Sequence, residues 1–224
     1  MLDAFPWAER DALTLDERYR TRQLPLLHDR PRPPLGPRSL GPGEFWPPVR
    51  SVVVPLPKSL LEAPSVRAFL ADLAASAAAP AVWFAGIQAR ADRMHATLAP
   101  GVSDVGGVLP DAARRPLDMV VRGPWVGRYN RGRIYLPVEP ADAATTAALA
   151  ALATHVGAPF RPLLAGFVQL RQDVTAAAYD GLRSLVAHHR ERLVVPLRVD
   201  EVHLTETMDD LVLRSRVVER IALG

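Results

Sequence analysis

The sequence predicts an α+β protein whose sheets are mainly antiparallel. Helical patterns occur between groups of strand patterns rather than after every strand, whereas a doubly wound parallel sheet requires regular alternation of the two. The chain also lacks the GxGxxG and GxxxxGK[ST] loops that bind phosphates in Rossmann and P-loop proteins. Its 224 residues, 49% of them hydrophobic, are enough to bury one large core or two small ones.

The first 48 residues differ in composition from the remainder. Seven prolines lie between positions 31 and 48, and such a segment is expected to run extended over a surface or to stay partly disordered. We therefore predict an N-terminal extension over residues 1–48 and a folded domain over 49–224. A wrapping tail is the simpler interpretation of the extension, and a lid or a partner arm is the functional one.

In the first half of the domain, the apolar run SVVVPLP predicts a buried strand over residues 51–57. Apolar residues at helical spacing predict a helix over 59–78, interrupted early by Pro64. The stretches AVWFAGI (81–87) and RMHATLA (93–99) are typical of two further strands.

In the second half, residues 116–140 predict two strands joined by a turn near 130–132. An alanine-rich helix is expected over 141–157, where the last residue is a terminating glycine. Another helix is expected over 173–192, with Asp173 as its N-cap. Further strands are predicted over 161–172, 193–207 and 215–223.

Arginine dominates the basic residues, because Lys58 is the only lysine. Arginine suits bidentate contacts with phosphate, but genome base composition can also replace lysine with arginine. The net charge of +3 therefore permits a phosphate-bearing partner without requiring one.

The chain contains no cysteine, which excludes disulfides and thiolate metal sites. The sequence contains no run of 18 or more apolar residues, so it predicts no transmembrane helix. The N-terminus lacks the apolar core of a signal peptide. We therefore expect a cytoplasmic protein without membrane association. The sequence does not predict its oligomeric state.

Two short stretches repeat the pattern His-x-Thr within a strand. RMHATLAP places His95 and Thr97 on one face of its strand and apolar residues on the other, because side chains alternate along a strand. EVHLTET does the same with His203 and Thr205. If both strands face one cleft, these four residues are the predicted catalytic set.

Two histidines facing one cleft can act as a general base and a general acid. One neutral imidazole can deprotonate a nucleophilic water or hydroxyl, while an imidazolium protonates the leaving oxygen, since histidine titrates near neutral pH. Each threonine hydroxyl can bind a phosphate oxygen or orient its histidine. The sequence contains no evident cluster of metal ligands, so we expect no metal and no cofactor.

With two HxT motifs in two halves of an α+β chain, the sequence resembles the 2H phosphoesterase superfamily, which includes RNA 2′,3′-cyclic phosphodiesterases, also called 2′–5′ RNA ligases. The similarity begins near residue 50 and covers the opening apolar strand and helix, a tryptophan before HATL, and the closing VDEVHL and RSRVVERIAL. The resemblance implies two lobes of antiparallel sheet around a central cleft, with helices outside. It also implies an RNA or cyclic nucleotide substrate.

The second motif departs from the typical family pattern. In ligase-like members it follows F-x-P, which here corresponds to PFRPLLAGF and puts Leu163 and Ala165 at the histidine and threonine positions. Either the second histidine of this chain is His203, one strand later, or the second half is degenerate and His203 is coincidental.

The stretch GRYNRGRIYL concentrates arginines around tyrosines. We predict Arg128, Tyr129, Arg131 and Arg133 as substrate-binding residues that hold phosphate and stack on a base. A solvated hairpin turn is the alternative interpretation.

Three functions remain open from the sequence. The first is a metal-independent phosphodiesterase that acts on 2′,3′-cyclic phosphate or 2′–5′ linkages of RNA or a nucleotide, as a hydrolase or in the ligase direction. The second is a degenerate 2H-like module that binds RNA ends or nucleotides without turnover. The third is an interaction protein that works through its proline-rich extension.

Overall fold

The computed structural model describes residues 4–28 and 45–224. The helices are α1 (Glu17–Arg22), α2 (Leu24–His28), α3 (Pro64–Ala75), α4 (Phe84–Ala89), α5 (Ala143–His155) and α6 (Ala176–Arg190). The strands are β1 (Val49–Pro55), β2 (His95–Pro100), β3 (Leu117–Arg122), β4 (Trp125–Val126), β5 (Arg133–Pro140), β6 (Leu163–Gln169), β7 (Val194–Val199), β8 (Glu201–Thr207) and β9 (Ser215–Ala222).

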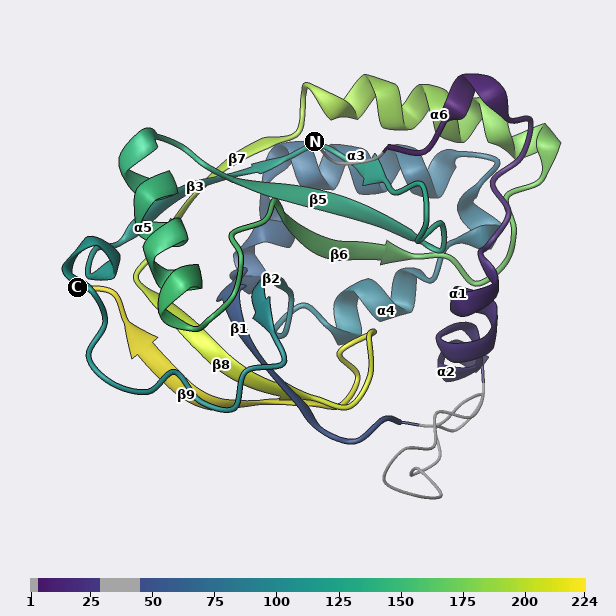
Figure 1. Ribbon diagram of the computed structural model, residues 1–224. Helices are drawn as coiled ribbons and strands as arrows, with labels where there is room; N and C mark the ends of the chain where they lie inside the picture. Colours follow the sequence, from purple (N-terminus) through teal and green to yellow (C-terminus); the bar gives the residue numbers. More distant parts are fainter. Residues whose placement is uncertain (1–3, 29–44) are drawn as a thin grey trace.

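The strands form one antiparallel sheet in the order β7-β3-β5-β6-β2-β1-β8-β9, with β4 paired to β5. The helices lie outside it, and α3 and α6 run side by side over one face (Figure 1). The predicted α+β class with mainly antiparallel strands is therefore confirmed. Two halves of the sheet meet at β2 and β6, where the register contains the single pair Ala96–Ala165.

The sheet must curl strongly, because β7 and β8 are consecutive in the chain but belong to opposite halves of the sheet. Only Asp200 separates them, whereas β7 is the edge strand beside β3 and β8 lies between β1 and β9. Consecutive Cα atoms are about 3.8 Å apart, so the two ends of the sheet must approach each other at this residue. The predicted single strand over 193–207 is thus two strands with a bend between them.

The prediction of a strand over 81–87 is wrong, because this run leads into helix α4. Only Val82 is extended, in an isolated bridge to Leu170, and the Trp83 N–H donates to the Gln169 carbonyl. A short apolar run fits a buried strand and a buried helix equally well, and the apolar face of α4 is buried here through Ile87.

The prediction for Asp173 is also wrong, because Thr175 is the N-cap of α6. The Asp173 carboxylate instead accepts from the Leu15 N–H and pairs with Arg20. An acidic residue two positions before the N-cap of a helix can satisfy another segment, and nothing in the local sequence reveals that segment. The helix predicted over 141–157 is confirmed as α5, and Gly157 follows it at φ +71°.

The region predicted as two strands over 116–140 contains three, since β4 interrupts the connection between β3 and β5. The expected turn near 130–132 is present between β4 and β5. The short β4 could not be distinguished in the sequence from the loop that surrounds it.

The N-terminal segment packs on the domain along α6 and beside the sheet (Figure 1). Phe5, Leu13, Leu15 and Tyr19 are buried in the same core as the strands. Residues 4–28 therefore contribute to the core, while most of the proline-rich stretch lies outside the described residues. Among those that are described, no helix is long and apolar enough to span a membrane.

Candidate functional site

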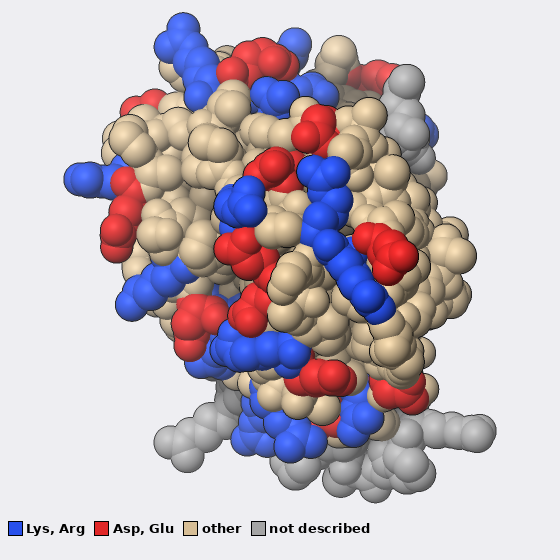
Figure 2. Space-filling model, turned by 90° about the vertical axis from the view of Figure 1, so that its left-hand side faces the viewer, with Lys and Arg blue, Asp and Glu red and all other residues tan. Residues whose placement is uncertain are grey.

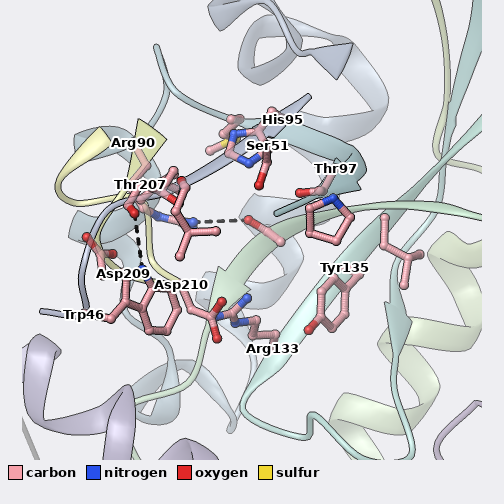
Figure 3. Close-up of a pocket in the computed structure, with 16 residues that line it drawn as sticks. Trp46, Ser51, Arg90, His95, Thr97, Arg133, Tyr135, Thr207, Asp209 and Asp210 are labelled. Carbon is pink, nitrogen blue, oxygen red and sulfur yellow. Dashed lines mark hydrogen bonds and ion pairs between the residues drawn. The ribbon is translucent and has the colours of Figure 1, made fainter. Parts of the chain in front are cut away.

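A cavity of about 310 Å³ opens over the middle of the sheet, where its two halves meet. His95 and Thr97 of β2 line it, as the alternation of side chains predicts. Ala96 and Leu98 point to the opposite side and are buried in the core. Figure 3 shows His95 and Thr97 on one side of the cavity, with Arg133 and Tyr135 across from them.

The neighbouring strand β6 presents no histidine or threonine to this cavity. Since Ala96 pairs with Ala165, the cavity-facing residues of β6 are Leu164, opposite Thr97, and Gly166, opposite His95. Leu163 and Ala165 are buried in the core, at 3% and 2% exposure. The expectation that these two residues occupy the second-motif positions is therefore off by one residue.

The His95 ring is held in one tautomer by the backbone. Its Nδ1 lies 2.9 Å from the Arg93 carbonyl oxygen, and a carbonyl can only accept, so Nδ1 carries the proton. In the neutral ring, Nε2 is then the free acceptor. Burial lowers the pKa of His95 below its ordinary value, and the charges of Arg90 and His203 act in the same direction. His95 therefore favours the neutral form that a general base requires.

Arg133 is the cation of the opposite wall, and it is 8% exposed. Its Nη2 lies 3.5 Å from the Asp210 carboxylate, and its Nε and Nη2 donate no hydrogen bond to any residue in the described ranges. The Asp210 carboxylate also accepts from the Gln23 side chain of the N-terminal segment. Arg133 therefore has a weak partner and unused donor capacity.

Tyr135 lies on the same face of β5, two residues after Arg133. It pairs with Gly166, which separates it from His95. Burial raises the pKa of Tyr135, while the charge of Arg133 opposes the shift. The phenol therefore keeps its proton at neutral pH.

Arg90, by contrast, has a structural role beneath the cavity. It is 1% exposed and donates to the carbonyl oxygens of Gly86, Gly166 and Phe167. Burial lowers its pKa to about 10. These bonds tie α4 to β6 and fix the backbone at Gly166.

The rim of the cavity is shaped by the turn after β8. Asp209 is buried and its carboxylate accepts from the backbone N–H groups of Leu213 and Arg214. Burial raises its pKa, and the backbone donors oppose the rise. Both oxygens of Asp209 are thus used to hold the turn, which leaves its neighbour Asp210 to face Arg133.

His203 lines a second cavity of about 250 Å³, which His95 also borders. Both histidines lie on the same face of the sheet, but the buried Val53 of β1 separates their strands. The His203 Nε2 lies 2.7 Å from Glu201 Oε1 and 3.1 Å from Arg220 Nη1. This nitrogen is already engaged by the protein.

The other predicted residues are dispersed around these cavities. The Thr205 hydroxyl donates to the Ser51 carbonyl, and the residue is buried beside the second cavity. Arg128 and Tyr129 are exposed on the hairpin and line neither cavity. Arg131 packs on the N-terminal segment, where its N–H donates to Asp16. Of the four predicted substrate-binding residues, the structure brings only Arg133 to the cavity that His95 lines.

One group of potential metal ligands was not apparent from the sequence. Asp72 of α3 and His188 and His189 of α6 place their ligand atoms within 4.8 Å of one another. The Asp72 carboxylate is hydrogen-bonded to His189. This group lines neither cavity that contains His95, and no sequence spacing relates the two helices.

The face of the molecule shown in Figure 2 has no continuous basic patch, because basic and acidic side chains alternate across it. Several of the arginines near the sheet edge have acidic partners, including Arg216 with Glu206 and Arg220 with Glu201. Positive charge available to an anion is therefore better sought within the cavity than on this face.

Tyr135 belongs to the arginine-rich stretch but was not among the predicted binding residues, although its position on the cavity face could have been predicted. Arg133 and Tyr135 alternate with the buried Ile134 and Leu136, so they share the polar face of a strand. Arg90 and Asp210 carried no comparable signal, because their positions depend on contacts made across the fold.

No family model matches the chain, and no curated protein matches it significantly. Among solved structures, a conserved protein of unknown function from Agrobacterium tumefaciens, ATU0111, matches 91% of this chain and 100% of its own at 15% identity and a TM-score of 0.51. Escherichia coli LigT, a 2H phosphoesterase solved in complex with ATP, matches 80% of this chain and 99% of its own at 18% identity and a TM-score of 0.38. At such identities a likeness shows the fold alone, and a TM-score of 0.38 carries no argument by itself.

Proposed function

We propose that the chain is a phosphodiesterase that hydrolyses a 2′,3′-cyclic phosphate or a 2′–5′ linkage in RNA or a nucleotide, with His95 as its general base. The observation that carries the proposal is the fixed tautomer of His95, which leaves Nε2 as acceptor on a residue that lines the same cavity as Arg133, a cation with unused hydrogen-bond donors. A base and a cation in one cavity are what a phosphate ester requires. The resemblance of the HATL segment to 2H phosphoesterases supports the same reaction class.

In the proposed reaction, His95 Nε2 takes a proton from water as the water oxygen attacks phosphorus. The bond from phosphorus to the ribose oxygen breaks, and that oxygen leaves with the electron pair and must gain a proton. The Thr97 hydroxyl, which belongs to the same cavity lining, donates to a non-bridging phosphate oxygen in this proposal. The product of a cyclic phosphate is a phosphate monoester.

The paired-histidine mechanism predicted from the sequence remains a proposal of its own. For His203 to protonate the leaving oxygen, the phosphate would have to lie over Val53, in the second cavity, and Nε2 would have to leave Glu201 and Arg220. For a phosphate in the first cavity, the proton donor must come from the opposite wall.

A second candidate function is binding of a nucleotide or RNA end without turnover. The observation that favours it is the pair Leu164 and Gly166, which face Thr97 and His95 respectively and cannot transfer a proton. This candidate predicts retained binding and no hydrolysis.

The test is an assay of the purified full chain on a dinucleotide with a 2′,3′-cyclic phosphate, with formation of the phosphate monoester as the readout. We expect turnover that falls by about 10²–10⁴-fold in His95→Gln, the usual contribution of a positioned base. His188→Gln, an exposed histidine on α6, is the matched control and should leave turnover unchanged. Binding of the dinucleotide without any monoester product would establish the second candidate instead.

A further inference from the structure

The cavity has a gap in its floor at Gly166. This residue lies opposite His95 on one side and opposite Tyr135 on the other, so three neighbouring strands present histidine, glycine and tyrosine in a row. Neighbouring strands are about 4.8 Å apart, which puts the Cα atoms of His95 and Tyr135 roughly 10 Å apart, and the residue between them on β6 has no side chain. That space matches a phosphate group between two hydrogen-bonding side chains.

The Arg133 side chain reaches toward the same gap. If Gly166 carried a Cβ atom, its nearest neighbours would include Arg133 Nη1 at 3.7 Å and Arg133 Cδ at 3.8 Å. The guanidinium thus lies beside Gly166. Arg133 precedes Tyr135 by two residues on β5, so both side chains belong to the same face of the strand. The absence of a side chain at Gly166 leaves this cation next to the space that faces His95.

The charge of Arg133 is only weakly matched by the protein around it. Asp210 lies 3.5 Å away and is shared with Gln23, and Nε and Nη2 lack hydrogen-bond acceptors among the described residues. Arg90, the other buried cation of the cavity, uses its donors on three carbonyl oxygens. Burying a guanidinium with unused donors is unfavourable unless an anion or water completes its contacts. Arg133 is therefore the cation available to a ligand here.

We infer that Arg133 and Tyr135 form the second half of the site: Arg133 binds the reacting phosphate above Gly166, and Tyr135 donates the proton to the leaving oxygen. For a phosphate in this cavity they take the role of a second histidine, because the residues of β6 that face Thr97 and His95 are Leu164 and Gly166. The assignment to a reacting phosphate rests on the proposed function. The phosphate-binding part does not depend on turnover.

The proton balance follows from the geometry. Water gives its proton to His95 Nε2 and its oxygen bonds to phosphorus, while the ribose oxygen leaves and takes the Tyr135 proton. The resulting phenolate lies on the same wall as the Arg133 guanidinium, which stabilises its charge. Proton transfer from the His95 imidazolium through water then restores the phenol.

The binding experiment uses inorganic phosphate as the probe and isothermal titration calorimetry of the full chain, at constant ionic strength with chloride. We expect wild type to bind phosphate and Arg133→Gln to bind it at least tenfold more weakly. Arg133→Lys should be intermediate, because lysine keeps the charge but not the planar donor array. Arg114→Gln, an exposed arginine elsewhere on the surface, is the control and should bind like wild type.

Gly166→Val provides a second variant that does not alter any charge. The nearest atoms to an added Cβ are the side-chain nitrogens of Arg133 and Gln169 at 3.7 Å, an ordinary contact distance, and the backbone is not left-handed. We therefore expect the fold to accept the substitution while the side chain fills the phosphate space. We expect phosphate binding to be lost and the circular dichroism spectrum to be retained. If both Arg133→Gln and Gly166→Val bind phosphate as tightly as wild type, or if wild type does not bind it, the inference is overturned.

The role of Tyr135 is tested with Tyr135→Phe on the cyclic-phosphate dinucleotide. We expect kcat to fall by about 10²–10⁴-fold while phosphate affinity stays within about twofold, since only the proton donor is removed. An unchanged kcat would refute this role. If no variant or wild type hydrolyses the dinucleotide but phosphate binding still requires Arg133 and an open Gly166, the binding inference stands and the phosphodiesterase proposal fails.

Discussion

Tyr19 connects the N-terminal segment to the site. Removal of its side chain should lower the free energy of unfolding and weaken phosphate binding. The ring is 1% exposed and packs against Gly132, and its hydroxyl donates to the Leu170 carbonyl at 2.8 Å. Tyr19→Phe removes one buried hydrogen bond and should cost about 1 kcal/mol of unfolding free energy. Tyr19→Ala also removes the ring and should cost about 3–5 kcal/mol, the usual range for a buried aromatic residue.

The two variants should therefore differ by about 2–4 kcal/mol in urea unfolding, a difference that comes from packing and not from the hydroxyl. Gly132→Ala approaches the same contact from the other side, because an added Cβ would lie 2.3 Å from the Tyr19 ring. It should resemble Tyr19→Ala, while Arg18→Ala, on the exposed face of α1, should unfold like wild type.

The site should respond to the same change. Helix α1 leads directly to Gln23, which donates to Asp210, the partner of Arg133. When the segment loosens, Asp210 loses this donor and is free to pair more closely with Arg133, so phosphate should bind more weakly to Tyr19→Ala. Equal unfolding free energies for Tyr19→Ala and Tyr19→Phe, with unchanged phosphate affinity, would show that the segment is not anchored through this ring.

Three further predictions concern the chemistry. Because burial lowers the pKa of His95, turnover should be constant near pH 7 and fall only as the pH drops below the ordinary histidine value, which a pH profile of kcat/KM measures; a fall that begins above pH 7 would contradict the assignment. His203→Gln should reduce kcat less than Tyr135→Phe does, and the reverse order, measured on the same substrate, would establish the paired-histidine mechanism. Turnover should survive EDTA because the group of Asp72, His188 and His189 lines neither cavity. Loss of turnover on chelation, restored by a divalent ion, would refute a metal-independent reaction.

Local patterns were sufficient to predict most of the strands that build the cavity. Alternation along HATLA placed His95 and Thr97 on the polar face of a strand, and the structure has them lining the cavity while Ala96 and Leu98 are buried. The period of two depends only on the extended backbone, so it is visible within five residues. The helix over 141–157 was equally local, since Gly157 adopts the left-handed conformation that ends it.

The register between strands could not be read in the same way. Leu163 and Leu164 are adjacent apolar residues, and a shift of one residue exchanges the face that each one occupies. Only the pairing of Ala96 with Ala165 decides that Leu164 faces the cavity. A motif aligned by sequence alone therefore reached the correct strand but the wrong face.

The second half of the site is harder to predict because it is defined partly by a missing side chain. A glycine within a strand gives no indication of function, and Arg133 was identified only as one of several basic residues on a hairpin. The pairing of Gly166 with Tyr135 on one side, and its position opposite His95 on the other, turns that glycine into a space between a base and a phenol. Sequence motifs record the groups that perform chemistry, whereas the space in which a substrate binds depends on contacts across three strands.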